Sequence, residues 1–401
     1  MRILFLHLNF PGQFRHLAAA LAAAGHDVAF LCQTHYGRSL PGVRRLCMKG
    51  RLGHGALQQG GGNQLQRAQM AAKQYRQAMA QLQGEGWQPD VVVSHSGWGC
   101  GLHVKELWPR CRHVSYLEWW FDPQSQLLSH DPSNQALGLG PEVAPGFWLR
   151  NQHLALELVA ADAIVTPTQW QRQQLPPRLQ EHCQVIFDGV DSRRFKPDPS
   201  QRSSTPLLTY GTRGMEPMRC FPELVRELPA LLASWPELRV EIAGGDGIHY
   251  GGQTPAEGSW KSWAEQRLAE PLATGQVLWR GQLAGDQYVR WLQSSWCHVY
   301  LTQPFVASWS LVEALACGCT LIASDVPPVR EFCGRERAWL VDHREQGFLQ
   351  AAVLGLKGLK HLIQASDSGS STCQSLVPGL TIGESLQRWG VVLGEQVHTR
   401  G

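Results

Sequence analysis

The chain has 401 residues, of which 43% are hydrophobic and 17% are charged, a balance typical of folded rather than disordered proteins. A single hydrophobic core stops growing at roughly 250 residues, so this length favours two domains. The 36 Lys and Arg residues against 33 Asp and Glu residues give a net charge of +3. That charge is too small to make nucleic acid an expected partner.

The sequence shows no sign of a membrane anchor, a disulfide framework or a metal site. No apolar run approaches the roughly 20 residues of a membrane span. The apolar run at the start of the chain is shorter than that of a secretory signal. The 11 cysteines include no CxxC pair, and the 16 His residues are dispersed. We therefore expect a soluble, cytoplasmic protein with reduced thiols and no metal ion.

The first half of the chain alternates short apolar runs with helical patterns. The apolar runs predict strands over residues 3–6, 28–31, 90–93, 112–116, 163–166 and 184–187. Helical periodicity predicts helices over residues 14–21 and 63–82, the second of which follows a flexible connection at residues 60–62. Consecutive apolar strands joined by helices indicate a parallel sheet covered on both faces.

A second alternating series follows a segment rich in Pro and Ser. Strands are predicted over residues 207–210, 239–243, 276–279, 298–301 and 320–323. Helices are predicted over residues 221–232, 288–293, 311–317 and 380–397, the last after a Ser-rich stretch at 364–373 that we expect to be mobile. We predict a first domain (1–190), a linker (191–206), a second domain (207–375) and a C-terminal helix within 376–401 that could pack back on the first domain.

Two arginines, Arg213 and Arg219, lie in a loop between a predicted strand and a predicted helix N-terminus. Free backbone N–H groups and the positive end of the helix dipole suit such a loop to anions, and arginine adds bidentate recognition of phosphate. The alternative is a local ion pair of Arg213 with Glu216, worth roughly 0–1 kcal/mol at a surface. The strand–loop–helix context favours phosphate binding.

Glu313 has two possible roles. The segment from Ser310 to Glu313 has the pattern of a capping box, in which Glu313 would only satisfy the start of its own helix. Alternatively, Glu313 accepts hydrogen bonds from the two vicinal hydroxyls of a ribose. Spacing alone favours the capping role, whereas the presence of Arg213 and Arg219 in the same predicted domain favours ribose binding.

Several motifs of the sequence resemble those of retaining family-4 glycosyltransferases of GT-B fold, specifically of a bacterial branch. These motifs occupy residues 9–14, 95–99, 116–120, 166–170, 188–191, 213–219 and 304–331, in the order that the family requires. The last two are the most specific. The resemblance implies an α/β protein of two Rossmann-like, doubly wound parallel-sheet domains that face each other across a crevice.

The resemblance also implies roles for individual residues. Arg213 and Arg219 would hold the diphosphate of a nucleotide-sugar, and Glu313 would bind its ribose. Further substrate-binding positions would be Gly12, Gly245, Arg280, Gln282, Ser308, Trp309 and Ser310. Catalysis would consist mostly of positioning and of electrostatic stabilisation of the departing diphosphate, with retention of configuration. Neither a metal nor another cofactor is implied, since the arginines and the helix dipole replace the metal.

His95 and Glu118 are the candidate catalytic residues of the first domain. His95 ends a buried strand, where sites form in parallel sheets, and it could orient an acceptor hydroxyl. A structural His with satisfied hydrogen bonds is an equal alternative. Glu118, flanked by two tryptophans, is a candidate general base, and its alternative is an ion pair with an arginine such as Arg150.

The sequence departs from the family pattern at three places. Phe305 stands where the paired-Glu motif has its first Glu, which normally contacts sugar hydroxyls. The spacing from Arg213 to Arg219 is one residue longer than in most relatives, and the second basic residue is Arg rather than Lys. Many relatives carry a His near the position of Glu118. The departure at Phe305 puts the identity of the donor sugar in doubt more than nucleotide binding.

Two functions therefore compete. The first is a glycosyltransferase that moves a sugar from a nucleotide-diphosphate donor to a hydroxyl acceptor, either a glycan or a lipid-linked molecule, as in polysaccharide biosynthesis. The second is a catalytically degenerate partner subunit that binds nucleotide or glycan, which Phe305 favours. Residues 28–84 contain no acid and eight basic residues. They form either a solvated face or a surface for an anionic partner. That partner would be an anionic acceptor or, through residues 38–76, the anionic inner face of a membrane.

Overall fold

The computed structural model describes residues 1–48, 64–333, 338–358 and 377–394. The expected flexible connection at 60–62 and the expected mobile stretch at 364–373 lie outside the described residues. Contacts divide the chain into two compact units, which are described separately. Unit 1 comprises Met1–Ser125, Ala144–Gly189 and Ile382–Gly401, and unit 2 comprises Gln126–Val143 and Val190–Thr381.

This division differs from the predicted domain boundaries at Gln126–Val143, which belongs to unit 2. Hydrogen bonds explain the difference: Asn134 donates to Glu223 at 3.0 Å, and the Ala136 carbonyl accepts from the Gln253 N–H at 2.7 Å. The predicted linker also belongs to unit 2, where residues 199–201 form a 3₁₀ turn. The chain from Ile382 onward belongs to unit 1.

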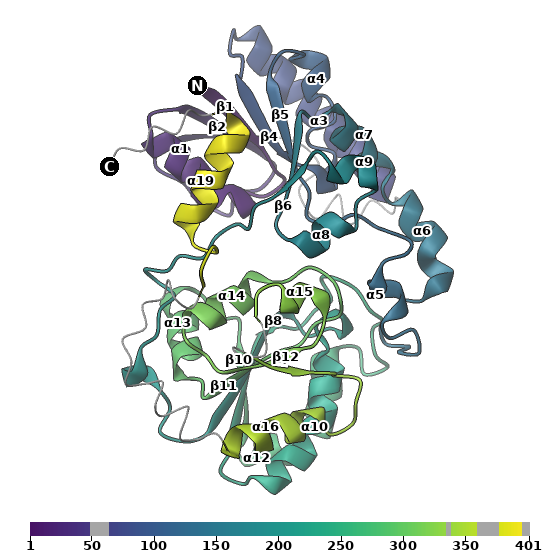
Figure 1. Cartoon of the computed structure of the whole chain (residues 1–401), viewed down its shortest axis with the longest axis vertical. Coiled ribbons are helices and arrows are strands. Elements are labelled where there is room, and N and C mark those ends of the chain that lie inside the picture. Colours follow the sequence, from purple (N-terminus) through teal and green to yellow (C-terminus); the bar gives the residue numbers. More distant parts are fainter. Residues whose placement is uncertain (49–63, 334–337, 359–376, 395–401) are drawn as a thin grey trace. The chain divides into compact units, whose positions relative to one another are not determined.

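Unit 1 contains a seven-stranded parallel sheet (Figure 1). Its strands are β1 (Arg2–Leu6), β2 (Asp27–Cys32), β3 (Val43–Cys47), β4 (Val91–His95), β5 (Arg112–Tyr116), β6 (Ala163–Thr166) and β7 (Cys183–Val185). Their spatial order is β3-β2-β1-β4-β5-β6-β7. The strand order therefore reverses between β1 and β4.

Helices cover both faces of this sheet. Successive side chains of a strand point to opposite faces, so each strand contributes to two separate cores. Ile3 and Phe5 join a core with α1 (Arg15–Ala23) and α19 (Ile382–Leu393). Leu4 and Leu6 join a second core with α3 (Gln64–Gly84) and α4 (Val104–Leu107). The other helices in the described residues of this unit are α6 (Ala144–Leu149), α7 (Gln152–Ala160), α8 (Gln169–Gln173) and α9 (Pro177–Gln180).

Strand β3 was not among the strands that the apolar runs predicted for unit 1. Its sequence, Val-Arg-Arg-Leu-Cys, places Arg44 and Arg45 in the middle of the strand, and both are exposed. β3 lies at the sheet edge, where charged side chains protect against pairing with another chain. Part of the acid-free basic stretch is therefore explained by edge protection.

Unit 2 contains a six-stranded parallel sheet of order β10-β9-β8-β11-β12-β13. Its strands are β8 (Leu207–Gly214), β9 (Arg239–Gly245), β10 (Val277–Gly281), β11 (Cys297–Tyr300), β12 (Leu321–Ser324) and β13 (Ala338–Val341). The helices that the structure describes here are α5 (Gln126–Ser129), α10 (Phe221–Ser234), α11 (Trp260–Arg267), α12 (Ala269–Ala273), α13 (Gly285–Ser294), α14 (Trp309–Ala316), α15 (Pro327–Arg330) and α16 (Phe348–Gly358).

Each unit is a doubly wound sheet with one point at which the strand order reverses. The reversal lies between β1 and β4 in unit 1 and between β8 and β11 in unit 2. Open parallel sheets bind ligands outside the carboxyl ends of the strands at such a point. The topology thus directs attention to residues that follow these four strands. In the described part of the chain, no helix is both long and apolar enough to span a bilayer.

Candidate active site

The carboxyl ends of β1 and β4 in unit 1 carry a cluster of three rings. His7 and His95 are both 2% exposed, and their ring centroids lie 4.9 Å apart. The Trp98 ring stacks on His95 at 4.2 Å and meets the edge of His7 at 5.0 Å. The two imidazoles are therefore fixed at the place where the topology predicts a ligand.

Glu118 follows β5 and reaches the same cluster. Its Oε2 lies 3.4 Å from His95 Nε2 and accepts a hydrogen bond from the Gln13 amide at 3.4 Å. The Glu118 side chain is 39% exposed, so it can meet a solute. The alternative pairing with Arg150 is wrong: Arg150 donates to Gln64 at 2.9 Å, and no ion pair between Arg150 and Glu118 occurs in the described residues.

Gly12 lies against this cluster in a backbone conformation that favours glycine. Its φ is +51°, and a Cβ there would lie 2.5 Å from His7 Nε2. His7 cannot move aside easily, because it is buried and bonded at both ring nitrogens. The expected role of Gly12 toward substrate stays a prediction, but its close approach to His7 already requires glycine.

Replacing Gly12 by alanine is expected to destabilise the protein by about 1–3 kcal/mol more than replacing Gly25, since only the first adds an overpacking clash. Gly25 is the matched control because its φ is +87° and nothing lies within 4 Å of its added Cβ. Urea denaturation of both variants measures the difference. Equal destabilisation would show that His7 is not held where the structure places it.

A buried carboxylate supports the strand ends from the other side. Glu157 of α7 is fully buried, and its carboxylate accepts hydrogen bonds from Ser94 Oγ (2.7 Å), Ser115 Oγ (3.2 Å) and the Gly101 N–H (3.3 Å). Ser94 precedes His95 in β4. Burial raises the pKa of Glu157 despite these three donors.

Because the folded-state pKa of Glu157 is raised, folding favours its protonated form. The resulting stabilisation is present at acid pH and is lost as the pH rises through the folded-state pKa. Glu157→Gln, which stays neutral, should therefore gain stability relative to the wild type between pH 5 and pH 8. The gain should be about 1.4 kcal/mol per unit of raised pKa. Denaturation at both pH values, with the exposed Glu181→Gln as control, tests this. A gain that does not change with pH would contradict it.

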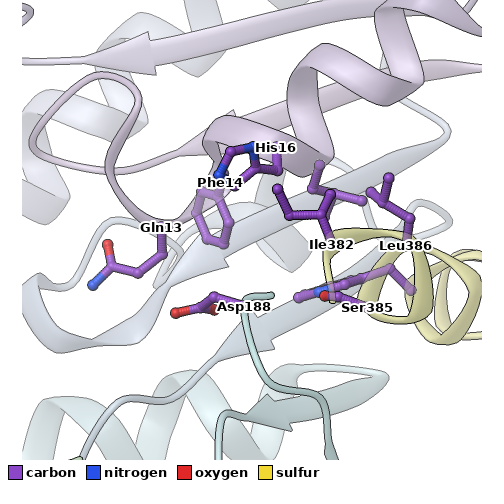
Figure 2. Close-up of a pocket in the computed structure, with 9 residues that line it drawn as sticks. Gln13, Phe14, His16, Asp188, Ile382, Ser385 and Leu386 are labelled. Atoms are coloured by element: carbon purple, nitrogen blue, oxygen red, sulfur yellow. The ribbon is translucent and has the colours of Figure 1, made fainter. Parts of the chain in front are cut away.

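A pocket of unit 1 opens beside Gln13 (Figure 2). Its lining consists of Gln13, Phe14, His16, Leu17 and Asp188 together with Ile382, Ser385, Leu386 and Trp389 of α19. Figure 2 shows the Gln13 side chain directed away from α19. Asp188 accepts a hydrogen bond from Tyr116 Oη at 2.9 Å, which links the pocket to the end of β5.

In unit 2, Arg213 lies near the carboxyl end of β8, beside two other predicted substrate-binding residues. A Cβ on Gly245 would lie 2.8 Å from the Gln282 amide and 3.2 Å from the Arg213 carbonyl oxygen. Arg213 is exposed. The alternative ion pair with Glu216 is wrong: the described residues show none, and Glu216 Oε2 instead accepts N–H groups of residues 249, 250 and 251 at 2.7–3.3 Å.

Arg219 is a buried cation with one unused donor. It is 4% exposed, and its Nη1 donates to Thr302 Oγ1 at 2.8 Å and to the Val306 carbonyl at 3.0 Å. Its guanidinium lies over the Tyr250 ring at 4.7 Å. Within the described residues its Nη2 is buried and has no hydrogen-bond partner. A buried unsatisfied donor is costly, so this atom has the capacity to bind a further acceptor.

The start of α14 shows that the capping-box interpretation is wrong. Ser308, not Ser310, is the N-cap residue, and its Oγ accepts the Ser310 N–H at 3.3 Å. Glu313 therefore lies beyond the first turn, and its Oε2 accepts a hydrogen bond from Tyr288 Oη at 3.0 Å. Burial raises the pKa of Glu313 to about 7. Trp309 follows the cap and is 45% exposed.

The Arg280 side chain has a local partner. Its Nη2 donates to Glu241 at 2.6 Å, and this ion pair raises the pKa of Arg280. The Arg280 side chain is 48% exposed, and its role toward a substrate stays a prediction. Phe305 packs on Tyr250, with ring centroids 5.9 Å apart.

Sequence reasoning missed the residues that join these parts. Tyr300 Oη accepts hydrogen bonds from Arg219 Nη1 (3.3 Å) and from the Ser308 N–H (2.8 Å), so it connects the arginine to α14. Tyr250, Tyr288 and Gln13 were missed as well. Only Gln13 carried a signal, because it lies in the resembling motif at residues 9–14.

Comparisons with known proteins concern the family and the fold of the chain. Residues 24–195 match the glycosyl transferase family 4 group. No curated protein matches the chain. Among solved structures the chain is similar to sucrose-phosphate synthase from Thermosynechococcus elongatus, with a TM-score of 0.70, 16% identity and 98% of each chain covered.

Two further similar structures hold nucleotides. Anabaena HepE in complex with UDP-glucose has a TM-score of 0.62 and 14% identity, covering 98% of this chain and 99% of that chain. The catalytic domain of starch synthase IV from Arabidopsis thaliana, bound to ADP and acarbose, has a TM-score of 0.62, 11% identity and 98% coverage of both chains. The resemblance to family 4 is thus confirmed over residues 24–195, and the chain has the GT-B fold.

Proposed function

We propose that the protein is a retaining, metal-independent glycosyltransferase that moves a sugar from a nucleotide-diphosphate donor to a hydroxyl acceptor. The observation that carries this proposal is Arg219, whose buried Nη2 lacks a partner in the described residues at the point where the strand order of unit 2 reverses. The exposed cation of Arg213 lies at the end of β8. A diphosphate supplies the anionic acceptors that these two side chains call for.

In the proposed reaction, the bond between the anomeric carbon and the β-phosphate oxygen breaks, and the diphosphate leaves with the electron pair. The acceptor oxygen forms the new bond to the anomeric carbon, and its proton passes to the leaving phosphate. Arg213 and Arg219 stabilise the developing charge, which is the larger share of such catalysis. Glu313 binds the ribose hydroxyls, and His95 with Glu118 orients the acceptor hydroxyl.

The nucleotides named for the similar structures, UDP-glucose and ADP, support a nucleotide-sugar as the donor class. The test is the release of nucleoside diphosphate from UDP-, ADP- and GDP-glucose by the wild type and by Glu118→Gln and His95→Ala. We expect release by the wild type and loss of about 100-fold or more in the variants. Binding of nucleotide without release from any donor would instead favour the degenerate partner subunit.

We further propose that unit 1 docks on the cytoplasmic face of an anionic membrane through residues 38–76. Arg44, Arg45 and Lys73 are exposed there, whereas Arg76 is paired with Glu106 at 2.5 Å. Two other members, Lys49 and Arg51, lie outside the described residues. Co-sedimentation with vesicles of anionic lipid should appear at low salt and fade at high salt. Equal co-sedimentation with neutral and anionic vesicles would contradict membrane docking. The basic residues would then serve only as a solvated face and as protection of the sheet edge.

A further inference from the structure

The two histidines at the end of β1 and β4 have determined tautomers. His7 Nδ1 accepts the N–H of Asn9 at 2.8 Å, and His95 Nδ1 accepts the N–H of Gly97 at 3.2 Å. A backbone N–H can only donate, so each Nδ1 is an acceptor and each neutral ring carries its proton on Nε2. Burial, and then the neighbouring His95, lowers the pKa of His7 well below its usual range, which keeps this ring neutral.

The tautomer of His7 fixes the orientation of Gln13. His7 Nε2 lies 2.7 Å from Gln13 Oε1 and must donate to it. The Gln13 amide therefore cannot be turned around, and its NH₂ group is directed to Glu118 Oε2 at 3.4 Å. The backbone of Asn9 thus determines, through His7, which group Gln13 presents to Glu118.

The same oxygen of Glu118 faces a second donor. His95 Nε2, which carries the other ring proton, lies 3.4 Å from Glu118 Oε2. In the described residues this nitrogen is buried and lacks a hydrogen-bond partner, so the contact falls short of a formed bond. Catalytic hydrogen bonds that are long without substrate commonly tighten in the complex. Two N–H groups therefore converge on Oε2 and leave Oε1 for a solute.

We propose that Gln13 is a positioning residue of the transfer reaction, which holds Glu118 with Oε1 directed to the acceptor hydroxyl. This inference rests on the proposed function, because Glu118 must touch the acceptor. Gln13 itself acts only through the carboxylate. His7 is the anchor of Gln13, and its Nε2 proton is the reason that Gln13 presents a donor rather than an acceptor.

The proposal is tested by a double-mutant cycle on nucleoside diphosphate release from whichever nucleotide-glucose the wild type consumes. Gln13→Leu should lower kcat by about tenfold or more in the wild-type background. In the Glu118→Gln background it should have almost no further effect, since the group that Gln13 positions is already lost. An equal loss in both backgrounds would overturn the proposal.

The pH profile of kcat/KM distinguishes a positioning role of Gln13 from a merely structural one, which would leave the profile unchanged. Gln13→Glu places a second carboxylate against Glu118 Oε2, and two carboxylates that share a site raise the pKa of one of them. The acid limb of kcat/KM should move up by about one pH unit, while Gln77→Glu, an exposed control on α3, should leave it unchanged. An unmoved limb in Gln13→Glu would contradict the proposal.

Calorimetric binding of UDP, ADP and GDP separates this inference from the proposed function. In this proposal Gln13 acts only through Glu118, so nucleotide affinity should be the same in Gln13→Leu and in the wild type. A wild type that releases no nucleotide overturns the proposed function and this inference with it. A wild type that turns over, with additive losses in the cycle, overturns this inference alone.

Discussion

Replacing Arg213 by alanine is expected to weaken the binding of a nucleoside diphosphate by about 100-fold, the value of one or two charged hydrogen bonds. Arg213 is exposed and has no ion pair with Glu216 in the described residues, so its loss removes a ligand contact rather than a structural one. Isothermal titration calorimetry measures the change, and thermal denaturation should show an unaltered fold.

The matched control for Arg213→Ala is Arg239→Ala. Arg239 begins β9 and is also exposed, so it removes the same charge from the opposite end of the same sheet. A general loss of positive field would weaken nucleotide binding in both variants. A loss confined to Arg213→Ala assigns the effect to the carboxyl ends of the strands. An unaffected Arg213→Ala would remove the diphosphate site from this loop.

The second large effect is a pH dependence of nucleotide binding that depends on Glu313. Its pKa is raised to about 7 by burial, so only about a tenth of the protein carries the carboxylate at pH 6. The carboxylate is the form that can accept hydrogen bonds from two ribose hydroxyls. Affinity for a nucleoside diphosphate should therefore rise by up to about tenfold from pH 6 to pH 8.

Glu313→Gln serves as the reference for this experiment, because it keeps the shape and the Tyr288 contact but cannot ionise. At pH 8 the variant should bind the same nucleotide about tenfold more weakly than the wild type does. Its affinity should also lack the rise with pH that ionisation of Glu313 gives the wild type. Titration of the phosphate groups is common to both proteins and cancels. Parallel pH dependences in wild type and variant would show that Glu313 does not bind the ribose.

The sequence predicted the fold well because the apolar strand runs are local signals. β1, β4 and β8 each stand out as buried runs bounded by turn residues. β3 was missed because it has no such apolar run. It is an edge strand with two exposed arginines, and it buries too few side chains to show a pattern. The segment 126–143 was assigned to the wrong unit, because its hydrogen bonds are with residues far away in the sequence.

The site was predictable only in part. Glycine and arginine positions could be marked from local motifs, and the structure brings Arg213, Gly245 and Gln282 together. The partners of the charged groups could not be predicted, because parallel sheets join distant segments. Glu216 bonds to backbone groups 33–35 residues later, and Gln13 reaches Glu118 across 105 residues. No spacing rule within one motif contains such contacts.

The central claim is that unit 2 holds a nucleoside diphosphate at the ends of β8 and β11. Calorimetric titration of the wild type with UDP, GDP and ADP tests it most directly. The account predicts that one of the three binds with a single site and that its base narrows the donors to assay. If none of the three binds, the buried donor of Arg219 has another acceptor, and the assignment as a nucleotide-sugar glycosyltransferase is contradicted.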